Sequence, residues 1–263
     1  MHGVIKVNYF NWQLDEPLDA ILFDCDGTLS AIEGIDALAL SAGEEIAHAV
    51  KVLTAEAMTQ TGINPEVFQK RLELVRPIKK QMLQLGDDYF QQRSPESQEV
   101  ITLLRALGKP IYILSAGLLP AVARFAELLQ IPSANIFAVD IQFDEQGNYL
   151  DFDRSSPLIH NHGKRIIAEQ LKMQHSHLLY MGDGLNDLAV RELVTRFIGY
   201  GGTYYRQNIA DQSDFYITHS SLLPLLPLAL TAQEADQLTT NQRELYEKGL
   251  VMLQEEDKVI KQA

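Results

Sequence analysis

The sequence predicts an α/β fold in which a parallel sheet forms the core and a helical cap domain is inserted into it. Short apolar segments alternate with helical patterns along most of the chain, the order expected for parallel strands joined by helices. Two of these segments lead directly into acidic clusters, at Asp24 and at Asp183. A helical stretch of roughly 35–93, without a strand pattern, separates the first apolar segment from the second. We therefore expect this stretch to cover the sheet edge where the acidic clusters meet.

Composition and charge limit the classes of function. The chain has 263 residues, of which 46% are hydrophobic, enough to bury a large core. Its net charge of −13 argues against an extended nucleic-acid groove or binding to an anionic membrane. No apolar run reaches the roughly 18 residues of a membrane span, and the first residues lack a signal-peptide pattern. The single cysteine, Cys25, excludes an internal disulfide and is typical of a reducing compartment, so we expect a cytoplasmic protein.

The elements follow one another in the order of a sheet with one insertion and one extension. The expected core strands cover 20–24, 111–115, 136–140, 178–182, 196–199 and 215–218. Two alternating segments on either side of Gly147-Asn148 predict a β-hairpin over 141–143 and 149–152. The polar end of the chain predicts helices. The expected domains are a core of 1–32 and 94–230, a cap of 33–93, and a C-terminal helical extension of 231–263.

The first acidic cluster follows the first expected strand. An apolar run before Gly27 predicts a buried strand that ends in a tight loop. Asp24 and Asp26 are two residues apart and therefore share a face, whereas Cys25 between them is expected to face the core. Two carboxylates held together require a cation or a shared proton. An acidic turn that only caps a helix is the simpler alternative.

The second acidic cluster is the segment 182–187, Gly-Asp-Gly-Leu-Asn-Asp, directly after another apolar run. Carboxyl ends of parallel strands meet at one edge of the sheet, where open α/β sheets bind their ligands. We therefore expect Asp183 and Asp187 to lie near the first cluster. Ligand sets made only of oxygen favour Mg²⁺, which adds water and a substrate phosphate oxygen to its protein ligands.

Two further segments carry groups suited to an anion. Ser115, Ala116 and Gly117 end an expected strand, and a helix is expected to begin near Pro120, so a hydroxyl and free N–H groups there can hold a phosphate. A plain strand-to-helix turn explains this segment equally well. Lys164 opens another helical stretch, where it is either an ordinary solvated lysine or a counter-charge for a phosphoryl group.

These motifs together resemble those of the haloacid dehalogenase (HAD) superfamily of phosphatases. The stretch 24–29, D-x-D-G-T-L, resembles the superfamily's first motif, and 182–187, G-D-G-x-N-D, resembles its fourth. The resemblance implies a HAD-type, Rossmann-like core with a helical cap, and a Mg²⁺-dependent phosphomonoesterase that forms an aspartyl phosphate. It implies that Asp24 is the nucleophile, that Asp26 is the acid and base, and that Lys164 is the catalytic cation.

The remaining site residues follow from the same resemblance. The metal is expected on the carboxylates of Asp24 and Asp183 and on the backbone carbonyl of Asp26. Asn186 and Asp187 are expected to orient the metal loop and the catalytic lysine. The phosphoryl oxygens are expected to contact Ser115, Ala116 and Gly117, and Asn186 is also expected to bind the substrate.

Within the superfamily, the chain is similar to phosphoserine phosphatases over about residues 19–230. The stretch 33–39, E-G-I-D-A-L-A, looks like that family's E-G-I-D-E-L-A, whose glutamate holds the amino group of phosphoserine. Arg71 matches an arginine that contacts the substrate carboxylate, and Met58 matches an R-A-M stretch of the family's cap. The resemblance thus implies O-phosphoserine as substrate, bound by Glu33, Arg71 and Met58, and a place in serine biosynthesis.

The match departs from the family pattern in three places, the first being Gly27, where the family usually has serine. An ungapped count back from Asp183 places the family's catalytic lysine at His162, whereas neighbouring HAD subfamilies carry it in a Gly-Lys pair, as at Gly163-Lys164. We expect Lys164 to be the catalytic residue and His162 to be a solvated loop histidine. The family has S-G-G-F where this chain has S-A-G-L at 115–118, and we expect the apolar Leu118 and Leu119 to alter the pocket near the phosphate.

Three functions are compatible with the sequence. The first is hydrolysis of O-phosphoserine or of another small phosphorylated metabolite. The second is transfer of the phosphoryl group to an alcohol. The third is an inactive fold that serves as a binding module, against which the presence of both Asp24 and Asp26 argues. The expected partner is a small phosphorylated metabolite, with no nucleic acid and no membrane, and the expected state is a monomer or homodimer.

Overall fold

The computed structural model describes residues 12–56, 62–255 and 259–261. Its main sheet has the strand order β3-β2-β1-β6-β7-β8-β9, and a separate hairpin is formed by β4 and β5. Adjacent strands from β3 to β8 are parallel, and β9 is antiparallel to β8. The strands are β1 (Ala20–Phe23), β2 (Ile111–Leu118), β3 (Ile136–Val139), β4 (Ile141–Phe143), β5 (Tyr149–Phe152), β6 (Leu178–Gly182), β7 (Arg196–Tyr200), β8 (Phe215–Ile217) and β9 (Val259–Lys261).

Helices account for the insertion, the connections and the C-terminal part of the described chain. Between β1 and β2 lie α1 (Gly34–Ala42), α2 (Glu44–Glu56), α3 (Pro65–Val75), α4 (Lys79–Gln91) and α5 (Ser97–Ala106). The connecting helices are α6 (Leu119–Leu128), α7 (Gly163–Lys172), α8 (Leu185–Leu188) and α9 (Gln207–Ala210). After β8 come α10 (Leu225–Ala229), α11 (Ala232–Asp236) and α12 (Thr240–Leu253).

The order of the strands locates the site. Counted along the chain, the parallel strands lie in the order 3-2-1-4-5-6, so the direction of winding reverses between β1 and β6. In such sheets, ligands bind outside the carboxyl ends of the strands at this reversal. Asp24 follows β1 and Asp183 follows β6, which places both acidic clusters at that point.

Local sequence explains why these elements form. Every side chain of β1 and of β6 is buried, as expected for strands covered on both faces. Helix α3 begins with Pro65 at its first position, and the side chain of Asn64 accepts a hydrogen bond from the N–H of Val67. Helix α7 buries Ile167, Ala168 and Leu171 along one stripe.

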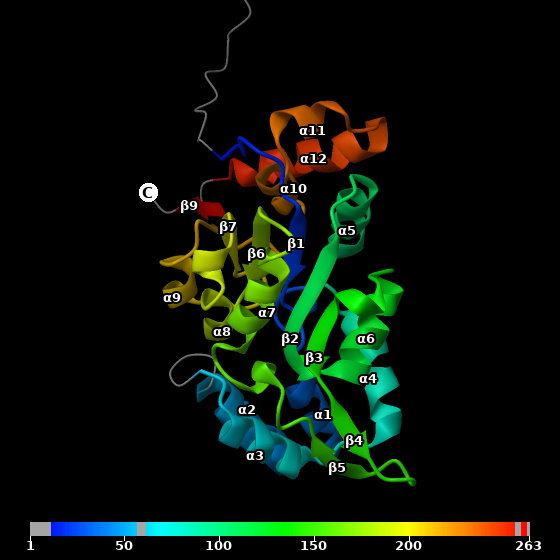
Figure 1. Ribbon diagram of the computed structural model, residues 1–263. Coiled ribbons are helices and arrows are strands. Elements are labelled where there is room, and N and C mark those ends of the chain that lie inside the picture. The colour runs from blue at the N-terminus through cyan, green and yellow to red at the C-terminus, as the bar shows by residue number, and fades with distance from the viewer. Residues whose placement is uncertain (1–11, 57–61, 256–258, 262–263) are drawn as a thin grey trace, which may run out of the picture.

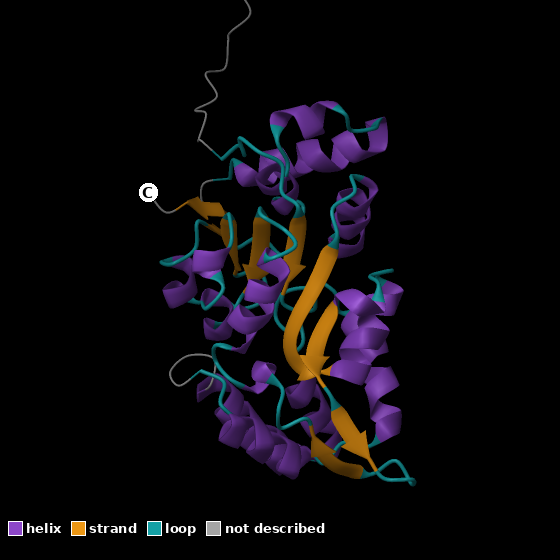
Figure 2. Ribbon diagram, viewed as in Figure 1, coloured by secondary structure: helices purple, strands orange, loops and turns teal. Residues whose placement is uncertain are grey.

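Besides the helices that flank the strands, two groups of helices lie beyond the two ends of the sheet (Figure 1). Figures 1 and 2 show α1, α2 and α3 beyond the arrowheads of the strands, and α11 and α12 at the opposite end. The β4–β5 hairpin also lies at the arrowhead end, where Phe152 packs edge-on against Phe68 of α3 with ring centroids 5.0 Å apart. Helices and hairpin thus cover the carboxyl ends of the strands together.

The predicted α/β fold, with a parallel sheet and a helical region after its first strand, is confirmed. The expected core strands and the hairpin are present, and Cys25 is fully buried. The prediction for the C-terminal extension was wrong in one part: 259–261 forms strand β9, which pairs with β8. Hydrogen-bonding groups on the edge of β8 provide that pairing, and the polar sequence of the extension gave no sign of it. The division into core, cap and extension remains our proposal.

Candidate active site

The loop after β1 brings the first acidic cluster to the reversal point. The N–H of Asp24 donates to the carbonyl of Met181 in β6 at 2.9 Å, which extends the sheet pairing into the loop. Gly27 has a φ of +72°, and a Cβ there would come within 2.5 Å of the Asp183 carboxylate. Only glycine accommodates both this backbone conformation and this close approach. The tight loop predicted from the sequence therefore packs directly against the second cluster.

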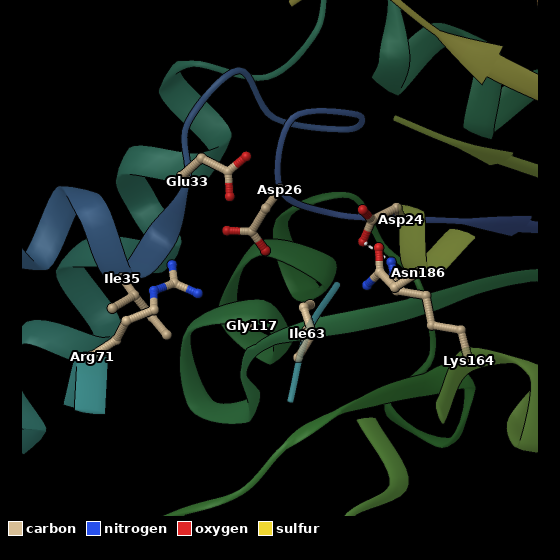
Figure 3. A pocket seen from close by; sticks show the side chains of 10 residues that line it. Asp24, Asp26, Glu33, Ile35, Ile63, Arg71, Gly117, Lys164 and Asn186 are labelled. Atoms are coloured by element: carbon tan, nitrogen blue, oxygen red, sulfur yellow. Dashed lines mark ion pairs between the residues drawn. The ribbon is translucent and has the colours of Figure 1, made fainter. Parts of the chain in front are cut away.

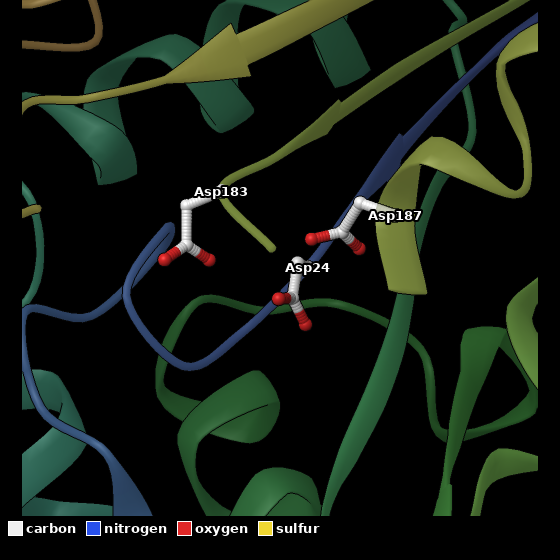
Figure 4. Close-up of side chains that lie close together, drawn as sticks. All are labelled: Asp24, Asp183 and Asp187. Carbon is white, nitrogen blue, oxygen red and sulfur yellow. The ribbon is translucent and has the colours of Figure 1, made fainter. Parts of the chain in front are cut away.

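Three buried carboxylates gather at the reversal point. One oxygen from each of Asp24, Asp183 and Asp187 lies within 4.8 Å of the others (Figure 4). Burial, reinforced by the charge of Asp187, raises the pKa of Asp24 well above its usual range. Burial likewise raises the pKa of Asp183 to about 6, against the opposing effect of Arg206. Burial is the largest cause of both shifts, and a bound cation would stabilise the charged carboxylates against it.

Lys164 bridges two of these carboxylates. Its Nζ lies 2.7 Å from Oδ1 of Asp24 and 2.6 Å from Oδ1 of Asp187, and its side chain is almost fully buried. Burial alone would lower the pKa of this lysine, but the charges of Asp187 and Asp24 outweigh that effect and raise it above its usual range. Lys164 is therefore a permanent cation within the cluster. His162, its sequence alternative, is exposed ahead of α7.

Donors occupy the carboxylate of Asp187. Its Oδ1 accepts hydrogen bonds from Nζ of Lys164 and from the hydroxyl of Tyr180, and its Oδ2 accepts one from the N–H of Gly184. This saturation fits the predicted role of orienting Lys164 and the loop better than it fits a metal ligand. The carboxylates of Asp24 and Asp183 stay our predicted metal ligands. The contribution expected from the backbone carbonyl of Asp26 stays a prediction.

The Asp26 carboxylate points away from this cluster. Its Oδ1 accepts hydrogen bonds from the N–H of Gly34 and from the hydroxyl of Tyr89, both at 2.6 Å. Its Oδ2 accepts one from the hydroxyl of Ser115 at 3.1 Å. Burial raises the pKa of Tyr89 well above its usual range, and the nearby charge of Asp26 adds to this effect. The hydroxyl of Tyr89 therefore keeps its proton and acts as the donor.

A small cavity of about 30 Å³ lies between these loops and the helices above them. Figure 3 shows Asp26 between Glu33 on one side and Gly117 on the other, with Asp24, Lys164 and Asn186 farther along the cavity. The lining residues are Asp24, Asp26, Glu33, Ile35, Ile63, Arg71, Ala116, Gly117, Lys164 and Asn186. Most residues predicted from the sequence thus share one cavity. Ser115 does not line it but contacts Asp26, and Met58 lies outside the described residues.

The two predicted cap residues already have charged neighbours. Arg71, buried to 6% exposure, contacts Asp36 through Nη2 at 3.0 Å, while its buried Nε has no hydrogen-bond partner among the described residues. Glu33 lies 4.0 Å from Arg206. Burial, with added repulsion from Asp26, raises the pKa of Glu33 to about 8. Both cap residues therefore have capacity for a further partner, Glu33 for a cation and Arg71 for an acceptor.

Two residues in this region, Arg206 and Tyr89, had no role predicted from the sequence. Arg206 donates to the carboxylate of Asp183 and also to its backbone carbonyl at 3.0 Å. Arg206 thereby fixes the carboxylate of Asp183 within the second acidic cluster. Tyr89 reaches Asp26 from α4, and nothing in the sequence distinguishes it from an ordinary core tyrosine.

Comparison with known proteins agrees with this geometry. The model of the family described as haloacid dehalogenase-like hydrolase matches residues 18–191. The chain belongs to this family. The superfamily resemblance seen in the sequence is thereby confirmed, and the protein is a HAD hydrolase.

Curated relatives and solved structures narrow the comparison. The chain is 32% identical to phosphoserine phosphatase from Bos taurus and 31% identical to that from Homo sapiens, each over 76% of this chain and 89% of the relative. A phosphoserine phosphohydrolase-like protein from Francisella tularensis has 24% identity and a TM-score of 0.69, over 76% of this chain and 95% of that one. This HAD hydrolase is thus similar to phosphoserine phosphatases in sequence, and the solved structure supports its fold.

The cluster of buried aspartates is suitable for a metal ion. All its donor atoms are carboxylate oxygens, with no cysteine or histidine, which is the chemistry preferred by hard divalent cations.

The sequence also predicted no membrane-spanning helix. Among the described residues, no helix combines the length and the apolar character needed to cross a bilayer.

Proposed function

We propose that this HAD hydrolase is a Mg²⁺-dependent phosphomonoesterase that hydrolyses O-phosphoserine through an aspartyl phosphate on Asp24. The observation that carries the proposal is the shared cavity in which Asp24, Asp26 and Lys164 meet a carboxyl group and a guanidinium from the cap, those of Glu33 and Arg71. The first three provide a nucleophile, an acid and a fixed cation. The cap pair provides one partner for an ammonium and one for a carboxylate.

The chemical steps use the residues as follows. The carboxylate of Asp24 attacks phosphorus, and the bond to the ester oxygen breaks while Asp26 delivers a proton to that oxygen. Asp26 then takes a proton from the water that attacks the phosphorus of the aspartyl phosphate, which frees phosphate and restores Asp24. Lys164 keeps its charge throughout and stabilises the negative oxygens of the transition state.

The metal would be held by the carboxylates of Asp24 and Asp183 and by the backbone carbonyl of Asp26. Bound there, Mg²⁺ would supply Lewis-acid stabilisation of charge on the phosphoryl oxygens. Arg206 holds the Asp183 carboxylate from the other side and so fixes its orientation.

Metal dependence is the first expected result. EDTA should abolish phosphate release, and added Mg²⁺ should restore it, because the proposed ligands are all hard oxygens. The same titration followed by thermal melting should show that Mg²⁺ raises the melting temperature of the wild type but not of Asp183→Asn. Turnover that is unchanged in EDTA would remove the metal from the mechanism.

Substrate choice is tested by a crossed comparison of three small esters. O-phosphoserine carries an ammonium and a carboxylate, phosphoethanolamine only the ammonium, and 3-phosphooxypropanoate only the carboxylate. Glu33→Gln should lower kcat/KM roughly thirtyfold or more for the first two esters, because loss of a buried charged partner costs about 2–5 kcal/mol. It should leave 3-phosphooxypropanoate nearly unchanged. Arg71→Gln should instead spare phosphoethanolamine.

The exposed Glu45→Gln on α2 serves as the matched control and should change none of the three values. Equal losses of kcat/KM on all three esters would show that Glu33 and Arg71 have only a structural role. A wild type that hydrolyses other phosphate esters but ignores O-phosphoserine would restrict the proposal to the chemistry and direct attention to Leu118 and Leu119. Product analysis with added alcohols separates hydrolysis from phosphoryl transfer, and we expect free phosphate to predominate.

We also propose a role in serine formation, since hydrolysis of O-phosphoserine releases serine. A cytoplasmic location is proposed on the free thiol of Cys25, which is compatible with a reducing compartment. The expected partner remains a small phosphorylated metabolite, and the monomer or homodimer state remains a prediction.

A further inference from the structure

Tyr89 connects a helix of the inserted region to the expected acid of the reaction. It lies near the end of α4, is fully buried, and donates its hydroxyl to Oδ1 of Asp26 at 2.6 Å. Its ring packs against Phe125 of α6, with centroids 5.6 Å apart. The backbone of Gly34 packs against the Tyr89 hydroxyl, because a Cβ at Gly34 would overlap that hydroxyl. The hydroxyl therefore has a single position, set by packing on both sides.

The two oxygens of the Asp26 carboxylate have different surroundings. Oδ1 accepts two short hydrogen bonds, from Tyr89 and from the N–H of Gly34, so both of its lone-pair directions are in use. Oδ2 accepts one longer bond, from Ser115. A Cβ on the cavity-lining Gly117 would come within 2.9 Å of Oδ2, which places this oxygen on the cavity side. Only Oδ2 has room for a proton that can be passed to a ligand in the cavity.

We propose that Tyr89 is a positioning residue for proton transfer: it holds Oδ1 of Asp26 so that Oδ2 meets the oxygen of the leaving alcohol. The inference rests on the proposed function. As the bond from phosphorus to the ester oxygen breaks, its electron pair stays on that oxygen, and the proton on Oδ2 neutralises it. Because Tyr89 belongs to α4, the acid is aligned only while this helix sits against the sheet core.

Leaving groups that differ in basicity separate this role from a structural one. An alkoxide such as that of serine is a poor leaving group and needs the proton. The p-nitrophenolate of p-nitrophenyl phosphate and the acetate of acetyl phosphate leave without one. Misplacing the acid therefore slows attack on the alkyl ester alone, whereas general damage to the site slows attack on every substrate. The ratio kcat/KM is the suitable measure, because it reports the steps up to formation of the phosphoenzyme.

The experiment compares Tyr89→Phe with wild type on O-phosphoserine, p-nitrophenyl phosphate and acetyl phosphate in saturating Mg²⁺. The variant keeps the ring and loses only the hydroxyl. We expect kcat/KM for O-phosphoserine to fall about tenfold or more, a part of the 10²–10⁴-fold that a positioned acid contributes. The values for the two activated substrates should stay within about twofold. The matched control is Tyr112→Phe, whose hydroxyl contacts His175 outside the site, and it should change none of them.

A double-variant comparison tests the coupling directly. In an Asp26→Asn background, Tyr89→Phe should cause no further loss on O-phosphoserine, since the group that it positions is already removed. Equal losses on all three substrates, or independent losses in the double variant, would make Tyr89 purely structural. Full activity of Tyr89→Phe on O-phosphoserine would also overturn the inference. A wild type that hydrolyses no phosphate ester would instead overturn the proposed function, and this inference with it.

Discussion

Asp24→Asn is expected to abolish turnover while leaving the fold intact. An amide cannot attack phosphorus, so kcat should fall by about 10⁴-fold or more, as is typical when a nucleophile is lost. Stability should hold or rise, because burial and the charge of Asp187 already raise the pKa of Asp24, and the substitution removes one of several crowded charges. Phosphate release and thermal melting measure the two effects independently.

Trapping the intermediate gives a third readout for Asp24. Wild type quenched in acid after mixing with radiolabelled substrate should carry an acid-stable, base-labile phosphoryl group, and Asp24→Asn should carry none. Asp236→Asn, an exposed aspartate of α11 at the far end of the sheet, is the matched control and should behave as wild type. A labelled, active Asp24→Asn enzyme would show that another residue is the nucleophile.

Lys164→Ala is expected to have the second largest effect. Its ammonium lies within 2.7 Å of carboxylates on two sides, so its removal leaves Asp24 and Asp187 without their common cation. Loss of a preorganised charge at the transferring group should lower kcat by about 10²–10³-fold. Breaking a buried ion pair on one side should also cost about 3–5 kcal/mol of stability, visible as a lower melting temperature.

His162→Ala is the natural comparison, because this residue is the alternative given by an ungapped alignment. It is exposed, so its replacement should change kcat by less than about twofold and leave the melting temperature unchanged. Lys164→Arg helps to separate charge from position: it keeps the charge but should recover only part of the activity, since a planar guanidinium does not fit the two contacts of an ammonium. The reverse ranking of Lys164 and His162 would move the catalytic role to His162.

The sequence predicted the sheet and the acidic clusters because their signals are local. An apolar run that ends at a glycine and an aspartate contains both the strand and the loop, as at Asp24 and again at Asp183. Once the strands are parallel, their carboxyl ends must meet, so the proximity of these two residues follows from topology. The position of Lys164 at the start of a helix could also be predicted from the local sequence. Its burial between two carboxylates, in contrast, depends on how side chains far apart in the sequence pack together.

Other contacts in the site were beyond sequence reasoning for a physical reason. The hydrogen bond between Tyr89 and Asp26 joins residues 63 positions apart, and the pairing of Arg71 with Asp36 joins residues 35 apart. Each depends on how a helix of the inserted region is rotated against its neighbours, which side-chain packing decides. Strand β9 was missed for a similar reason, because a three-residue segment pairs wherever an edge is available and needs little sequence signal of its own.

The volume of the cavity has a thermodynamic consequence. About 30 Å³ has room for about two water molecules, far less than a phosphate ester requires. Binding of a phosphate ester therefore requires this cavity to widen, and the free energy of widening weakens the apparent affinity. Contacts that hold the helices against the sheet, including the Tyr89–Asp26 hydrogen bond, oppose this widening while they align the acid. Tight apparent binding and precise alignment of the acid thus place opposite demands on the same contacts.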